Sequence, residues 1–128
     1  TIGALDKALC AYWEPGAPSP QERLVCLRHA YEEGFQTSVS VEPMLASREE
    51  TLRLVAEVSP CVTDTIWLGK MQRIPQKHNA HVAGFAEAVA LIKSQQSDAE
   101  ILALVKRLKN NAKVQWKDSI KEVIARCR

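Results

Sequence analysis

Short apolar runs with a period of two mark the strands of this chain. Val39 and Val41 alternate with serines, as in a strand with one buried face, and Pro43 ends the run because proline has no N–H for a ladder. A second strand is predicted over residues 65–71, and residues 1–3 resemble the end of another. Helical patterns separate these strands at intervals of about 30 residues, which predicts βαβ units and a parallel sheet.

Three helices are predicted by capping boxes, in which a serine is followed three residues later by a glutamate. The boxes are residues 19–22, 47–50 and 97–100. The first helix is expected to run to Glu33 and to stop at Gly34, since glycine adopts the left-handed conformation that ends many helices. Its predicted buried side consists of Leu24, Leu27, Ala30 and Tyr31.

Residues 74–128 have a mainly helical pattern. Asn79 can cap a helix whose apolar positions lie within residues 82–92, and residues 113–116 can form a short strand before a final helix. We therefore predict an α/β fold in which residues 1–73 hold the parallel strands and residues 74–128 form a helical C-terminal extension.

The composition is that of an ordinary globular protein. The chain has 128 residues, of which 46% are hydrophobic and 25% charged. Its apolar runs are too short to cross a bilayer, and no signal sequence is evident, so we expect a soluble, cytoplasmic protein. Because residues 1–3 look like a strand without its first half, we also expect the natural polypeptide to begin further upstream.

Four cysteines are spread along the chain, and none lies within four residues of another. This spacing excludes a CxxC or CxxxCxxC cluster and favours reduced, structural cysteines. His78 and His81 lie three residues apart, but no third ligand is evident beside them, and zinc normally takes three or four protein ligands. The sequence therefore predicts no metal site.

Positive charge is concentrated near the C-terminus. Residues 106–128 carry eight Lys or Arg against two acidic residues, although the whole chain is only +2. Lys113, Lys117 and Lys121 would form one basic stripe on a single helix, with Trp116 beside it to stack on a base. The stretch is either a nucleic-acid contact or a solvated helix face with a core tryptophan.

Polar residues that follow parallel strands are the first candidates for a site, because ligands bind beyond the carboxyl ends of such strands. Gly3, Glu42 and Lys70 occupy these positions. Glu42 can hydrogen bond to hydroxyl or amino groups or transfer a proton, and otherwise is an exposed turn residue. Lys70 can bind a carboxylate or phosphate, and otherwise is a solvated rim lysine.

Two segments resemble the radical S-adenosylmethionine (radical SAM) superfamily, in the branch of spore photoproduct lyase and photolyase-like proteins. The first is Tyr12 to Leu24, YWEPGAPSPQERL, and the second is Ser38 to Leu45, SVSVEPML. Their order and spacing also match, and the resemblance covers about residues 1–73. It implies the C-terminal part of a TIM-like (βα) barrel.

The resemblance also implies a binding site for S-adenosylmethionine (SAM). Thr1 would lie on the fourth strand of the barrel, with its hydroxyl against the ligand and Gly3 just beyond. Ser40 and Glu42 would lie at the end of the fifth strand, and Lys70 at the exit of the sixth. These are the expected cofactor-binding residues.

The family's cysteine loop, which holds a 4Fe-4S cluster, has no counterpart in the sequence. The cluster is therefore expected only through a missing N-terminal region, and this chain alone is not expected to be active. No catalytic residue is assigned. Glu14 is expected either to form an ion pair with Arg23 or, together with Trp13, to line the mouth of the substrate site.

Three functions stay open at this point. The first is part of a radical SAM enzyme, lyase-like in its full-length form. The second is a nucleic-acid-binding module that uses the basic tail. The third is a structural half-barrel that pairs with another chain, or with its own missing N-terminal half, because an unpaired strand edge invites pairing. The substrate is not specified by the sequence.

Overall fold

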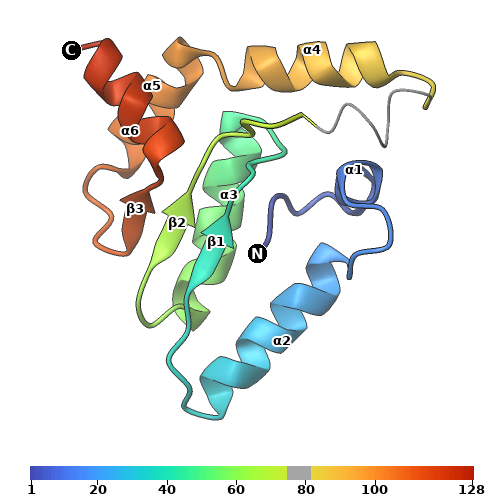
Figure 1. Cartoon of the computed structure of the whole chain (residues 1–128). Coiled ribbons are helices and arrows are strands. Elements are labelled where there is room, and N and C mark those ends of the chain that lie inside the picture. The colour runs from blue at the N-terminus through green and yellow to red at the C-terminus, as the bar shows by residue number, and fades with distance from the viewer. Residues whose placement is uncertain (75–81) are drawn as a thin grey trace.

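A parallel sheet of three short strands lies at the centre of the chain. The computed structural model describes residues 1–74 and 82–128 (Figure 1). Strands β1 (Val39–Val41), β2 (Ile66–Leu68) and β3 (Val114–Trp116) lie in that order, all parallel. The predicted α/β class, the parallel sheet and the short strand near residue 115 are confirmed. The second strand is shorter than the predicted 65–71.

Six α-helices and one 3-10 helix surround the sheet in the part of the chain that is described. They are α1 (Lys7–Trp13), α2 (Pro20–Glu32), α3 (Arg48–Val58), η1 (Ser59–Cys61), α4 (Phe85–Gln95), α5 (Asp98–Leu108) and α6 (Asp118–Arg126). Helix α1 was not predicted. Its signal is Asp6, whose Oδ1 accepts a hydrogen bond of 2.8 Å from the Leu9 amide and so caps the helix.

The main core lies on one face of the sheet. Side chains alternate along a strand, so Val39 and Val41 point to the same side, where they meet Ile66, Leu68 and Val114. Helices α3, α5 and α6 cover this side with apolar residues of the same cluster, and α2 adds two leucines at its margin. Figure 1 shows α3 running along the sheet and α5 and α6 gathered near β3.

The predicted capping boxes hold at two of the three helices. Ser19 and Ser47 each accept a bond from the backbone of the glutamate three residues on, and that glutamate bonds back to the serine amide. Ser97 accepts one bond of 3.4 Å from Glu100, whose carboxylate instead pairs with Arg48. The predicted stop at Gly34 is confirmed, with φ of 82°.

Two helix predictions differ from the structure. Tyr31 was placed on the buried side of α2 but is 45% exposed, because the core contacts of this helix are made by Leu24 and Leu27. The predicted cap Asn79 lies outside the described residues. Helix α4 begins at Phe85, directly after Gly84 in the left-handed conformation.

The C-terminal part is integral to the sheet. Strand β3 pairs along β2, and α5 and α6 bury Ile101, Leu104 and Ile120 in the same core as the strands. The boundary at residue 73 stays a prediction. In the ranges described, no helix has the length and apolarity needed to cross a bilayer.

The difference between the caps predicts a difference in stability. Replacing Ser47 with alanine removes the hydroxyl that accepts from the Glu50 amide at 3.3 Å and donates to the Glu50 carboxylate at 3.4 Å, and should lower the free energy of unfolding by about 1 kcal/mol. Ser97→Ala removes one long hydrogen bond and should cost clearly less. Urea unfolding of both variants tests this, and an equal or larger loss for Ser97→Ala would contradict it.

Candidate functional site on the polar face of the sheet

The N-terminal segment lies beside β1 and bonds to its backbone, but residues 1–3 are not a strand of the sheet, so the strand end predicted there is not confirmed. The Ile2 amide donates to the Ser40 carbonyl at 2.9 Å, and the Leu45 amide donates to the Gly3 carbonyl at 3.1 Å. In a parallel pair, the first bond places Ile2 opposite Val41. Both side chains belong to the core cluster, so Thr1 and Gly3 fall on the other face.

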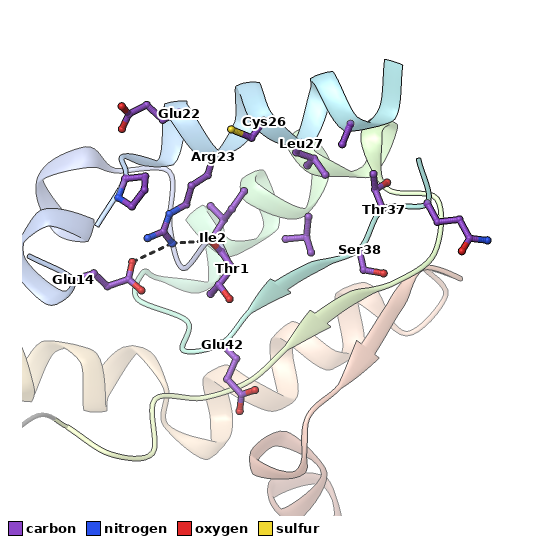
Figure 2. A pocket seen from close by; sticks show the side chains of 14 residues that line it. Thr1, Ile2, Glu14, Glu22, Arg23, Cys26, Leu27, Thr37, Ser38 and Glu42 are labelled. Atoms are coloured by element: carbon purple, nitrogen blue, oxygen red, sulfur yellow. Dashed lines mark hydrogen bonds and ion pairs between the residues drawn. The ribbon is translucent and has the colours of Figure 1, made fainter. Parts of the chain in front are cut away.

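The N-terminal segment and the three strands therefore contribute to one surface, which we call the polar face. It is the side of the sheet opposite α3 and consists of Thr1, Gly3, Ser40, Glu42, Trp67, Gly69, Gln115 and Lys117, as the strand register requires. In Figure 2, Ser38 and Glu42 project on the side of β1 away from α2. Four of the predicted cofactor-binding residues, Thr1, Gly3, Ser40 and Glu42, are thus brought to one face.

Lys117 is a member of this face that the sequence suggested only as part of a basic stripe for nucleic acid and not as a residue of the strand-end site. Its Nζ lies 3.3 Å from Glu42 Oε2 and 5.3 Å from the centre of the Trp67 ring. The ammonium therefore joins a carboxylate and an aromatic face at the carboxyl ends of the strands. The signal that could have found it is its position directly after β3, in the row of Glu42 and Gly69.

Glycines lie on both sides of Glu42 in this row. A Cβ added to Gly69 would lie 2.8 Å from Cγ and Cδ of Glu42, and one added to Gly3 would lie 2.8 Å from Leu45 and from the Pro43 carbonyl. Any larger residue would displace these neighbours. The absence of a side chain at Gly69 lets Glu42 lie against bare backbone, whereas the absence of one at Gly3 makes room for Leu45.

A hollow of about 820 Å³ runs along the free side of β1, between that strand and α2 (Figure 2). Thr1, Glu14 and Glu42 line its end near the carboxyl ends of the strands. Arg23 Nη1 lies 3.4 Å from Glu14 Oε2 and donates to the Thr1 carbonyl at 2.7 Å. The expected Glu14–Arg23 pair is confirmed, and it ties α2 to the N-terminal segment.

Trp13 does not line this hollow. Its side chain is 6% exposed and packs edge-on against Tyr12 and near Phe85, in a second apolar cluster beneath α1 and α4. Of the two residues expected at a substrate mouth, only Glu14 faces the hollow. Trp13 is instead an anchor of the core, because α1 turns its indole inward.

Lys70 also lies apart from the polar face. It follows Gly69 by one residue and so points to the helix side, where its Nζ is 4.0 Å from Asp98 Oδ1. Arg126 makes a bidentate pair with the same carboxylate, at 2.8 and 3.0 Å. The Lys70 ammonium thus belongs to a cluster that joins β2, α5 and α6, and Lys117 holds the position that Lys70 was expected to take.

The predicted basic stripe does not form. Lys113, Lys117 and Lys121 are not on one helix, since β3 lies between the first two. Lys113 Nζ donates to the Ser59 carbonyl at 2.7 Å, and Lys121 pairs with Asp118 at 3.5 Å. Trp116 packs against the core cluster rather than beside a basic stripe. The prediction of a single-helix stripe is therefore wrong, and nucleic-acid binding by residues 106–128 stays a prediction.

The four cysteines are free and differ in burial. Cys10 is buried, and burial raises the pKa of its thiol, whereas Cys26 lines the hollow and is exposed. Within residues 1–74 and 82–128, no group of three or more Cys, His, Asp or Glu could hold a metal ion. His78 and His81 lie outside these residues.

The Asp98 cluster predicts a pH dependence. The hydrogen bonds from Arg126 hold the pKa of the Asp98 carboxyl below its ordinary value, so this pair stabilises the fold above the unfolded pKa of about 4 and stops doing so as the pH falls through the lowered pKa. The stability difference between the natural protein and Arg126→Gln should be constant near neutrality and shrink below about pH 4. Urea unfolding across this pH range measures it.

The control for that experiment is Lys106→Gln, which removes the same charge from an exposed position of α5. Its stability difference from the natural protein should not show this collapse. A difference for Arg126→Gln that persists unchanged at the lowest pH would contradict the assignment.

Comparisons with known proteins add no relative. No protein-family model matches the chain, and no curated protein and no solved structure shows significant similarity to it. The polar face and the hollow are therefore the structural features from which a function is proposed.

Proposed function

We propose that this chain is the C-terminal part of a radical SAM enzyme, a partial (βα) barrel that contributes binding residues for SAM on its polar face. The observation that carries the proposal is the gathering of Thr1, Glu42 and Lys117 on one face, at or near the carboxyl ends of parallel strands. Ligands of parallel-stranded barrels bind at this end. The Tyr12–Leu24 and Ser38–Leu45 segments supply the family hypothesis.

The chemistry of these side chains fits the ligand. SAM combines an adenine ring, ribose hydroxyls and an amino acid. The Lys117 ammonium lies over the Trp67 ring, so adenine can stack on this indole once the ammonium turns to bind the ligand's carboxylate. The Glu42 carboxylate can accept from hydroxyl or amino groups.

The existing ion pair sets the mode of binding. Glu42 and Lys117 are each about one-third exposed and neutralise each other at 3.3 Å. A zwitterionic amino acid can replace this pair, with its carboxylate on Lys117 and its ammonium on Glu42, so that both charges keep a partner. The chain's own residues thus bind and orient the ligand.

SAM in this family supplies a deoxyadenosyl group for hydrogen abstraction, which requires an iron–sulfur cluster. The described residues do not fit such a cluster, because no three suitable ligands lie together among them. We therefore assign no electron-transfer step to this chain. Its proposed part is binding and orientation, and the cluster belongs to the proposed N-terminal region.

Calorimetric titration of the chain with SAM tests the proposal. Lys117→Gln should weaken binding about tenfold, because it removes a charge-assisted contact. Lys70→Gln is the matched control, since that ammonium faces Asp98 on the other side of the sheet, and it should leave the affinity unchanged. The lack of saturable binding, or equal effects of the two variants, would overturn the proposal.

A second candidate function, pairing with another polypeptide to complete the sheet, is favoured by the hollow beside β1. Val39 and Val41 are the residues of β1 that bond toward β2, so the backbone groups of Ser38 and Ser40 point to the opposite side. The Ser40 carbonyl accepts from Ile2, while Ser38 lines the hollow. Cys26 and Leu27 of α2 form the opposite wall.

These features fit an added parallel strand. An extended segment in the hollow would bond to the backbone beside Ser38 and place alternate apolar side chains against α2. The added segment would lie beside β1, in line with the N-terminal segment. It would pair with backbone N–H and C=O groups of β1 that otherwise have no strand partner on this edge.

Thiol protection measures such pairing. A peptide of alternating valine and threonine should slow alkylation of Cys26 in the hollow but not of Cys127, an exposed cysteine at the end of α6. The same peptide with N-methyl groups at alternate residues cannot donate to the strand edge and is the control. Equal protection by both peptides, or none by either, would contradict strand addition.

A further inference from the structure

A groove of about 660 Å³ lies between α3 and α5, on the helical side of the molecule. Leu52 and Ala103 are half-buried and form its floor, one from each helix. Arg53 on α3 and Lys106 and Arg107 on α5 line it as exposed side chains. The groove therefore has an apolar floor between two basic walls.

Arg48 fixes one end of this groove. Its Nη1 lies 3.2 Å from Glu100 Oε2 on α5, and its Nη2 lies 2.7 Å from Glu49 Oε1. The first contact links the two helices near their N-terminal ends. Arg48 is thus occupied in holding α3 against α5, and its single positive charge is met by two carboxylates.

The other three cations make no such ion pair, although the Arg107 guanidinium interacts electrostatically with Glu49 and adds to the Arg48 hydrogen bonds in lowering the pKa of that carboxyl. Over the ranges that the structure describes, Arg53, Lys106 and Arg107 have no carboxylate within 4.0 Å. Glu49 is the one acidic residue lining the groove, and its carboxylate is bound by Arg48. Like charges that face one hollow repel each other, and an anion placed between them removes that repulsion.

We infer that this groove binds an acidic segment of a partner protein, with an apolar side chain on the floor and carboxylates against both walls. Carboxylates match the arginine forks, as phosphates also do. The floor distinguishes the two, because Leu52 and Ala103 offer apolar contact that a phosphate backbone does not use. A peptide that alternates acidic and apolar positions uses both features.

This surface is separate from the proposed SAM site. Helix α3 covers the side of the sheet opposite the polar face, so a partner in the groove leaves Glu42 and Lys117 accessible. The inference therefore stands or falls independently of the proposed function.

Fluorescence anisotropy with a labelled glutamate peptide that carries leucine at every fourth position tests the inference. Replacing both Arg53 and Arg107 with serine should weaken binding roughly five- to tenfold. The control is the double variant Arg73→Ser, Lys93→Ser, which removes the same charge from exposed positions outside the groove. It should bind like the natural protein.

A second peptide, with serine in place of leucine, isolates the role of the floor and should bind several-fold more weakly to the natural protein. Equal losses in the two double variants would show a net-charge effect and overturn the inference. An oligothymidylate that displaces the leucine peptide and depends on the same arginines would also overturn it, in favour of a nucleic-acid surface.

Discussion

The in-register pairing of parallel strands is the constraint on which the rest of this structure depends. Because side chains alternate along each strand, the register that buries Val41 beside Leu68 also places Glu42 beside Gly69 on the opposite face. A slip of one residue would move the valines into solvent and the glutamate into the core. Burial of the apolar face therefore fixes the polar face at the same time.

Much of the fold could be predicted from local sequence. The valine–serine alternation around β1 and the serine caps at Ser19 and Ser47 depend on neighbours a few residues away, and both are confirmed. Helix α1 was missed because it is short, and its signal is the single cap at Asp6. Local patterns thus predicted the longer helices and the three-residue strands, and missed a seven-residue helix that has only one cap as its signal.

The candidate site could be predicted only in part, for a different reason. Glu42 was predicted because it follows a strand, which is a local property, whereas Thr1 was expected only from the family resemblance. Lys70 and Lys117 follow strands as well. Which of the two lysines faces the site depends on the alternation of side chains along β2 and β3, and on how these distant segments pair. This alternation places the Lys70 side chain near Asp98 and the Lys117 side chain near Glu42.

The account's central claim is that a nucleoside-like ligand with an amino-acid part binds on the polar face. Its most direct test is NMR of the isotope-labelled chain with S-adenosylhomocysteine, using nuclear Overhauser effects between ligand and protein. The account predicts contacts from the adenine protons to the Trp67 ring and from the amino-acid protons to the Lys117 side chain. Contacts confined to the helix side of the sheet, around Lys70 and Asp98, would contradict it.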